Sequence, residues 1–185
     1  MMPYRNHNYY YYKNQDVWSA LDYDEETYPG TFVYMHQCHE ENPKYAKGAE
    51  LIGYMKWSEV IKWENTCIGH RGDGYKQFKK EKAEQMINRL EECFPGTKAA
   101  IESYVTSSPL TYRDYTGTYQ GSIYGVIRDK NFPTQTLVSQ RTKIPNLFMT
   151  GQNINSHGIL GVTIGAAITC AEYLGLKTII QEIDK

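Results

Sequence analysis

Alternating hydrophobic and polar positions in the first third of the chain predict strands. Thr31–His36 alternates and is rich in β-branched and aromatic residues, which indicates a strand. Leu51–Trp57 predicts a second strand, antiparallel to the first. Residues 40–48 between them are charged and contain Pro43, which indicates a loop. Upstream, the tyrosine run Tyr9–Tyr12 fits either an edge strand or the lining of an apolar tunnel, and the pattern leaves both open.

Helical spacing takes over after the glycines at 72 and 74. A helix is predicted from about Tyr75 to Cys93, and Pro95-Gly96 ends it. Its apolar stripe consists of Tyr75, Phe78, Met86, Ile87, Leu90 and Phe94. Ala99–Val105 predicts a short second helix. Residues 106–125 are rich in threonine, tyrosine and glycine, which indicates loop and strand.

The C-terminal part combines a short apolar strand, a glycine and a helix with a smooth face, meaning a face of small side chains. Leu147–Met149 predicts the strand, Gly151 follows it, and a polar loop leads into a helix over Gly161–Leu174. Small side chains recur along that helix at Gly161, Gly165 and Thr169. Its first-turn amides, near Leu160–Thr163, have no partner within the helix and carry the positive end of its dipole, which suits an anionic or carbonyl-rich ligand. Tight helix packing, with glycines serving only as turn residues, explains the same pattern.

Composition narrows the class of protein. The chain has 185 residues, enough for one domain or one and a half. Twenty basic and 21 acidic residues give a net charge of −1, so nothing points to nucleic acid or an acidic membrane surface. No run of about 18 apolar residues predicts a transmembrane segment, and the N-terminus lacks the apolar core of a signal peptide. Four well-separated cysteines fit a reduced, cytoplasmic protein.

Two blocks of the sequence resemble a known family. Ile144–Gly175, which includes Met-Thr-Gly-Gln-Asn-Ile-Asn-Ser-His-Gly-Ile-Leu-Gly-Val, resembles the C-terminal FAD-contacting segment of the phytoene desaturase family. That family includes carotenoid isomerases and retinol saturases. Ser108–Gly117, followed by Gly121–Gly125, resembles the stretch that joins the family's substrate domain to its last cofactor segment. The resemblance is closest to bacterial phytoene-dehydrogenase-related proteins.

The resemblance implies a cofactor and a chemistry. It implies FAD-dependent oxidoreduction of a polyene-like or retinoid-like apolar substrate, in which hydride moves between a substrate carbon and the flavin. By position, Gly151 and Gln152 would lie beside the pyrophosphate and ribityl chain. Many relatives have an acidic residue where Gln152 stands. The isoalloxazine would be contacted by Gly158, Leu160, Gly161 and Val162.

The resemblance also implies a fold. The expected class is α/β or α+β, with residues 1–125 as an incomplete substrate-type domain built on a mainly antiparallel sheet. Residues 126–185 would supply the last strand and helix of a Rossmann-like, dinucleotide-binding domain. The family's Gly-x-Gly-x-x-Gly turn is missing, because Gly72-Asp73-Gly74 has no third glycine. We therefore expect the C-terminal part of such an enzyme, inactive and unable to retain FAD by itself.

Four other side chains are candidates for a role in the site. Tyr124 is the aromatic residue expected to line a cofactor or substrate cleft. His157 is either a proton donor near a flavin or a loop histidine. Arg113 and Asp114 form either a local ion pair or a substrate contact. No residue is an obvious acid-base catalyst.

Two further classes of function compete with the oxidoreductase. The chain could be a non-catalytic module that associates with itself or with a missing N-terminal half. It could also be a zinc-binding structural protein, because His and Cys residues occur in two groups. These are His36, Cys38 and His39 in the first group, and Cys67 and His70 in the second. The spacing favours solvated or core side chains over metal ligands, so no metal site is predicted.

Overall fold

The computed structural model describes residues 2–126, 128, 129 and 131–184, without the side chain of Trp18. The chain divides into two compact units, residues 1–121 and residues 122–185. We refer to them as unit 1 and unit 2.

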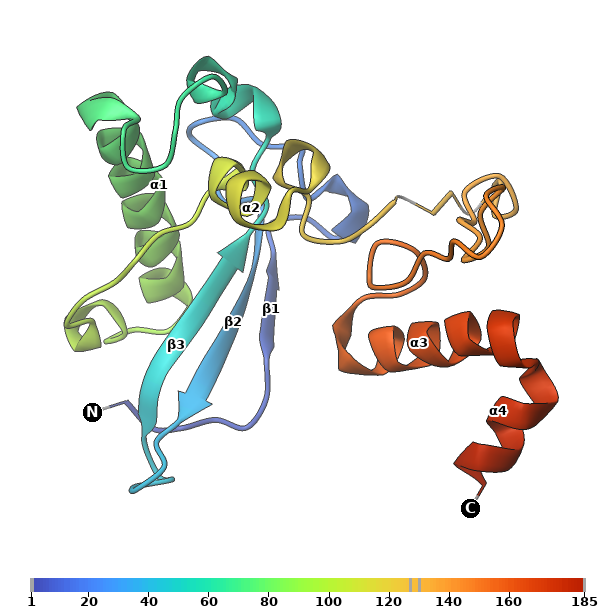
Figure 1. The fold of residues 1–185 in the computed structure, drawn as a ribbon. Helices are drawn as coiled ribbons and strands as arrows, with labels where there is room; N and C mark the ends of the chain where they lie inside the picture. The colour runs from blue at the N-terminus through green and yellow to red at the C-terminus, as the bar shows by residue number, and fades with distance from the viewer. Residues whose placement is uncertain (1, 127, 130, 185) are drawn as a thin grey trace. The chain divides into compact units, whose positions relative to one another are not determined.

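Unit 1 is built on a three-stranded antiparallel sheet (Figure 1). Its strands are β1 (Tyr9–Tyr12), β2 (Thr31–Cys38) and β3 (Ala46–Gly53), in the order β1-β2-β3. The strand predicted at Thr31–His36 is therefore confirmed as the central strand. The tyrosine run forms an edge strand, and its side chains alternate between the core and solvent as the pleat requires.

The second predicted strand is antiparallel to the first, as expected, but its bounds were wrong. β3 begins at Ala46, within the predicted loop, and ends at Gly53 rather than at Trp57. β2 is eight residues long, and pairing runs from Phe32 with Gly53 to Cys38 with Ala46, across an irregularity at Gln37/Cys38. Backbone pairing along β2 from Phe32 to Cys38 thus extends β3 toward the N-terminus, because unpaired strand groups are unfavourable.

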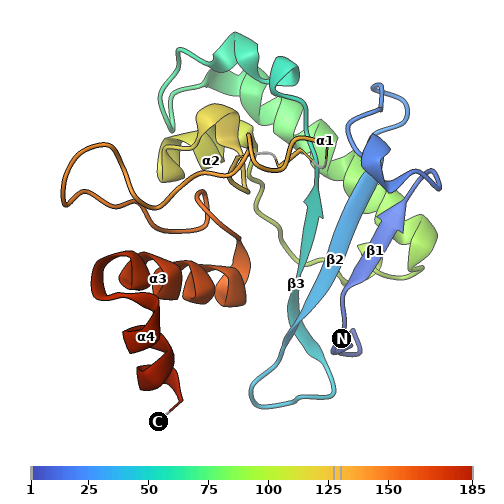
Figure 2. The same ribbon diagram turned by 90° about the vertical axis from the view of Figure 1, so that its right-hand side faces the viewer.

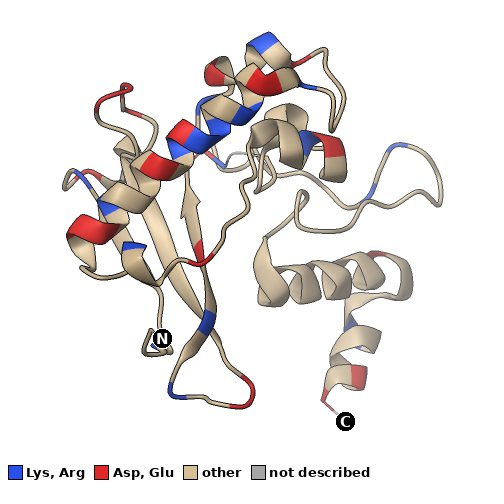
Figure 3. Ribbon diagram, turned by 90° about the vertical axis from the view of Figure 1, so that its left-hand side faces the viewer, with Lys and Arg blue, Asp and Glu red and all other residues tan. Residues whose placement is uncertain are grey.

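One long helix covers one face of the sheet. α1 (Gly72–Cys93) crosses behind the strands in Figure 2, and its length agrees with the sequence prediction apart from an earlier start. Phe32, Tyr34 and Leu90 form the buried centre of this layer, with Met86 and Phe94 packed against it. Figure 3 shows closely spaced basic and acidic residues along α1.

Short helices complete unit 1. They are the 3-10 helices η1 (Val17–Ser19), η2 (Trp57–Glu59), η3 (Ile61–Trp63), η4 (Lys98–Ala100) and η5 (Tyr119–Gly121), and the α-helix α2 (Pro109–Thr116). Leu110 of α2 packs with Val60 and Tyr75 in a second buried cluster.

Two predictions for this region were wrong. The helix expected over Ala99–Val105 is only the single turn η4, and Val105 is almost fully exposed, so no apolar face stabilises a longer helix. The loop and strand expected over residues 106–125 contain α2 instead. Its start is fixed by a Ser108 capping box and by Pro109 in the first turn, which outweigh the β propensity of the threonines and tyrosines.

Unit 2 consists of loops followed by two helices, α3 (Gly158–Leu174) and α4 (Leu176–Ile183). The terminal helix was predicted, but α4 was not. The strand predicted at Leu147–Met149 is reduced to a single bridge between Arg141 and Phe148. The described part of unit 2 contains no extended strand with which it could pair. Among the described residues, no helix combines the length and apolar character needed to cross a membrane.

The observed architecture is thus a mixture of helices with an antiparallel sheet. The Rossmann-like character of residues 126–185 stays a prediction.

Candidate functional site

The start of α3 is the polar end of an otherwise apolar helix. His157 is its N-cap, with φ −89° and ψ 172°, and its side chain makes no capping hydrogen bond. Gly158 follows with φ +76°, and a Cβ placed there would meet nothing within 4 Å. The first-turn amides consequently begin at Gly158, not near Leu160–Thr163 as predicted, because the helix starts earlier. Uncapped amides at this end offer hydrogen-bond donors and the positive end of the dipole.

Gly151 begins the loop that leads to this helix end. Its φ of +103° lies in the left-handed region, which residues with a side chain rarely adopt. A Cβ placed there would meet no atom within 4 Å. The amide of Ile154 donates to the Gly151 carbonyl at 3.1 Å, which closes a turn. The loop over residues 151–157 is therefore turned locally by its own backbone.

Residues 122–126 and Arg128 lie against this loop. A Cβ added to Gly125 would come within 2.4 Å of Asn153 Cα, so the two backbones are in close contact. Gln152 Nε2 donates to the Ile123 carbonyl at 3.3 Å, and Arg128 Nη2 donates to the Ile154 carbonyl at 3.0 Å. The two blocks that carry the family resemblance thus meet at Ile123–Gly125 and the 151–157 loop.

Two of the candidate side chains meet at this point. The rings of Tyr124 and His157 have centroids 4.2 Å apart and a tilted arrangement. Tyr124 is 45% exposed, and His157 is also exposed. The pair forms an accessible aromatic surface beside the helix N-terminus. Spacing in the sequence gave no indication that they pair.

Gly161 is enclosed by the loop that precedes α3. It is buried, and a Cβ there would come within 2.7 Å of the Ser156 carbonyl carbon. Gly165 is also buried, beside Asn155. The smooth face of α3 is therefore covered by the preceding loop. Of the other predicted cofactor residues, Gln152, Gly158, Leu160 and Val162 are exposed and Gly151 is half-buried.

Arg128 is the residue of this site that the sequence interpretation missed. It also donates to the Asn155 carbonyl and so binds two consecutive carbonyls of the 151–157 loop. An arginine near a glycine-rich block is a weak signal, because nothing in the spacing says which carbonyls it will meet.

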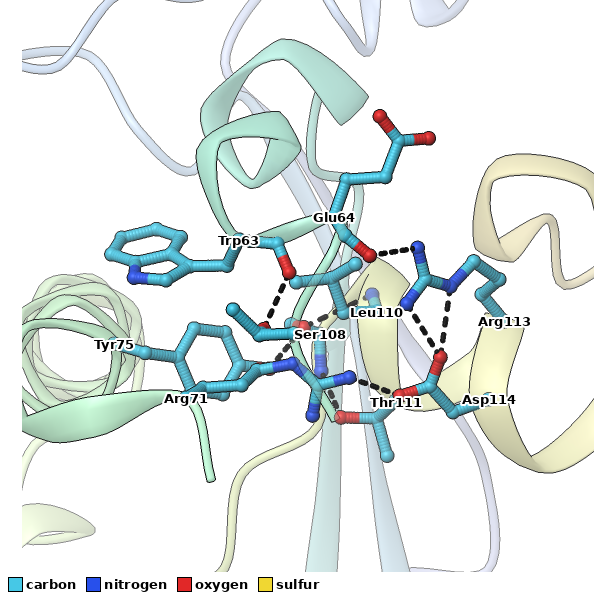
Figure 4. Close-up of polar contacts among 10 residues, drawn as sticks. Trp63, Glu64, Arg71, Tyr75, Ser108, Leu110, Thr111, Arg113 and Asp114 are labelled. Atoms are coloured by element: carbon cyan, nitrogen blue, oxygen red, sulfur yellow. Dashed lines mark hydrogen bonds and ion pairs between the residues drawn. The ribbon is translucent and has the colours of Figure 1, made fainter. Parts of the chain in front are cut away.

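Unit 1 contains a partly buried ion cluster, shown in Figure 4. Asp114 pairs with Arg71, and its Oδ1 accepts hydrogen bonds from Arg113 at 2.8 Å. Burial raises the pKa of Asp114, but the hydrogen bonds and charges of Arg113 and Arg71 outweigh it and hold the pKa below its usual 3.8. Arg113 also donates to the Glu64 carbonyl at 2.8 Å. The interpretation of Arg113 and Asp114 as a local ion pair is confirmed, and the pair extends to Arg71.

A second polar cluster was not predicted. Lys82, on the buried side of α1, lies 2.5 Å from a Glu59 carboxylate oxygen and over the ring of Tyr28. Tyr23 donates to the other Glu59 oxygen. Burial and this hydrogen bond raise the pKa of Tyr23 far above its usual range. The cluster joins α1 and η2 to the chain before β2. A lysine within an apolar helix stripe is the signal that could have located it.

The His and Cys groups are not brought together. Among the described residues, no cluster of three or more metal-ligating side chains exists, and the four cysteines are free and exposed. His36 Nδ1 accepts the Arg5 amide at 3.1 Å, and His39 Nδ1 accepts the Glu41 and Asn42 amides at 3.2 Å. The Nδ1 atoms of His36 and His39 thus accept backbone amides. The structure therefore does not support the zinc alternative.

Comparison with known proteins adds a likeness to one kind of enzyme. The chain is 31% identical over 123 residues to the all-trans-retinol 13,14-reductase of Rattus norvegicus, which is 65% of this chain and 20% of that protein. It is 30% identical over 122 residues to the Homo sapiens enzyme and 28% identical over 129 residues to the Danio rerio enzyme. The chain thus spans about a fifth of these relatives. No family model and no solved structure matches it.

Proposed function

We propose that this chain provides the cofactor-facing C-terminal segment and part of the substrate domain of an FAD-dependent oxidoreductase of the phytoene desaturase type. Its substrate would be an apolar polyene or retinoid. The observation that carries the proposal is the likeness to all-trans-retinol 13,14-reductases over about two thirds of the chain. Their name describes reduction of one double bond of a retinoid.

The start of α3 fits the polar part of a flavin. The amides of Gly158, Ile159 and Leu160 have no partner within the helix, and these residues are exposed. They would donate to a carbonyl or phosphate oxygen, and the absence of a Cβ at Gly158 would permit close approach. When bound, FAD would supply the group that accepts or donates hydride. Gly151, Gln152 and Val162 would border the same cofactor.

The remaining residues would shape the site. Gly161 would keep the 151–157 loop close to α3, rather than contact the flavin directly. Arg128 would hold the same loop through the Ile154 carbonyl. The exposed pair Tyr124 and His157 would border an apolar substrate with ring surface, and no acid-base residue is required of them.

A non-catalytic interaction module is the second candidate, and one observation favours it. α3 and α4 expose many large apolar side chains, including Ile159, Leu160 and Tyr173, each at least 73% exposed. Such a surface is typical of protein contacts. A second copy of this chain or another polypeptide could cover it without any cofactor.

A chimeric enzyme distinguishes the two. The whole chain would replace the segment of the human all-trans-retinol 13,14-reductase with which it aligns. If the oxidoreductase proposal is right, the purified chimera should contain stoichiometric flavin and should reduce all-trans-retinol. A matched chimera carrying the zebrafish segment shows whether the graft site tolerates exchange. If the zebrafish graft works while this chain gives a folded protein without flavin, the oxidoreductase proposal is wrong.

A further inference from the structure

Unit 1 contains a pocket of its own. Its volume is about 360 Å³, within the range of small-molecule sites. It opens where the start of the chain meets the edge of the sheet and the turn after α1. Arg5, Tyr9, Tyr34, His36 and Phe94 are among its lining residues. None of them belongs to the proposed flavin-facing segment.

Two partly buried aromatic side chains, Tyr9 and Phe94, form its apolar wall, and the third aromatic residue of the lining, Tyr34, is fully buried. Phe94 meets Tyr9 edge-on, with ring centroids 4.7 Å apart, and lies 5.3 Å from Tyr34. Aromatic pairs in these geometries leave ring faces and edges to receive another ring. A flat, conjugated group therefore matches this wall better than a branched aliphatic one.

The polar side of the pocket is basic. The Arg5 amide donates to His36 Nδ1 at 3.1 Å, which ties the exposed Arg5 to the central strand at the pocket. No aspartate or glutamate is among the described lining residues. His36, which also lines the pocket, has a buried Nε2 atom without a hydrogen-bond partner. Buried polar atoms are normally hydrogen-bonded. A guanidinium without a competing carboxylate favours an anion, and a carboxylate above all.

We propose that this pocket binds a small planar carboxylate, with its ring against Tyr9 and Phe94 and its carboxylate paired with the Arg5 guanidinium. Both parts of the ligand are needed, because the aromatic wall supplies area and Arg5 supplies orientation. The site is independent of FAD and of the proposed redox activity.

Cys93 allows a direct test in the full chain. It is free, exposed and lines the pocket, whereas the other three free cysteines do not. The measurement is the rate of iodoacetamide alkylation at each cysteine, followed by mass spectrometry, with indole-3-acetate as the probe. Indole-3-acetate should slow alkylation of Cys93 and leave Cys38, Cys67 and Cys170 unchanged. Indole alone and acetate alone should protect much less.

Arg5→Gln should weaken the protection by about tenfold in probe concentration, as expected for loss of one charge-assisted contact. Arg5 is exposed, so folding should be retained. Lys80→Gln removes the same charge from an exposed site on α1 and should change nothing. Absence of Cys93 protection, equal protection of all four cysteines, or unchanged protection in Arg5→Gln would overturn the proposal.

Discussion

Gly161 and Gly165 lie on the same face of α3 but differ in the room around them. A Cβ at Gly161 would overlap the backbone of Ser156, at 2.7 Å from its carbonyl carbon. A Cβ at Gly165 would lie 3.8 Å from Asn155 Cβ, an ordinary van der Waals contact. The first glycine is therefore required for packing, whereas the second is only accommodated.

Alanine substitutions should separate these two roles. Gly161→Ala should destabilise the loop–helix packing of unit 2 by about 1–3 kcal/mol, the usual cost of overpacking. Gly165→Ala should be neutral or stabilising by up to about 1 kcal/mol, because alanine favours the helix. Circular dichroism melts and hydrogen exchange of the 151–157 amides would measure both. Equal effects of the two changes would contradict the packing described for Ser156.

Asp114 should make the stability of unit 1 depend on acid pH. Because its pKa is lower in the folded state, its contribution is fully present above the unfolded value of 3.8 and is lost as pH falls through the folded pKa. Asp114→Asn should lower the unfolding free energy at neutral pH by about 1.5–3 kcal/mol, typical of hydrogen bonds to a charged group. Urea unfolding from pH 7 to pH 2 would show the difference between the two proteins shrinking with acid. A constant difference would exclude this role of the carboxylate.

At the scale of elements, α2 illustrates how a local signal fixes a helix. Ser108 accepts the Leu110 amide at 3.2 Å, and the Thr111 hydroxyl accepts the Ser108 amide at 3.2 Å. Ser108 Oγ also lies 2.7 Å from the buried Tyr75 hydroxyl of α1. One side chain thus both starts α2 and joins it to the long helix.

Ser108→Ala should therefore cost more than an ordinary cap. Loss of the cap costs about 1 kcal/mol, and the unpaired Tyr75 hydroxyl adds about 1–3 kcal/mol. Ser108→Ala combined with Tyr75→Phe should recover much of the second part. Chemical unfolding of the single and double variants would measure the coupling. If the two changes simply add, the hydrogen bond between α1 and α2 has no energetic role.

The sequence predicted best the elements whose pattern is long and regular. β2 and α1 have clear periodicity, and the tyrosine run Tyr9–Tyr12 alternates as an edge strand does. The bounds of β3 could not be predicted, because they depend on pairing with β2 rather than on its own pattern. α2 begins at the Ser108-Pro109 signal, which outweighs the β propensity of its threonines and tyrosines.

The candidate site was predicted in parts, not as an arrangement. Gly151 and Gly158 do occupy left-handed conformations beside the helix start, as glycine-rich turns imply. The contact of Gly125 with Asn153 and the tilted ring contact of Tyr124 with His157 join residues that are 28 and 33 positions apart. Contacts at such separations come from tertiary structure, and a single sequence carries no signal for them.

At the scale of the whole molecule, the two units differ in what they bury. The buried hydrophobic side chains among the described residues all lie in unit 1. In Figure 3, α3 carries one acidic band and is otherwise free of charged residues. The exposed apolar side chains of α3 and α4 are therefore not buried by other residues in the described part of unit 2. Contact with another polypeptide or a ligand would bury them.

We predict that the purified chain self-associates through these helices. Ile180 of α4 is 49% exposed, so Ile180→Lys should weaken association, whereas Thr178→Lys on the same helix adds the same charge at an exposed polar position and should not. Light scattering at micromolar concentration would measure the mass of each protein. A monomer near 21.4 kDa for the unaltered chain would contradict the prediction.

Gly158 stands at the start of α3, the part of the chain that we propose faces the flavin. Gly158 and Gly69 have φ values of +76° and +78°, and a Cβ at either would meet no atom within 4 Å. Valine should therefore cause similar backbone strain at the two positions, so any difference reports a ligand near Gly158.

The measurement is the ratio of bound flavin to protein in the human-enzyme chimera, with Gly158→Val and Gly69→Val compared. We predict that Gly158→Val loses flavin whereas Gly69→Val retains it, in chimeras that melt at similar temperatures. Equal flavin retention in both variants would show that the start of α3 does not face the flavin.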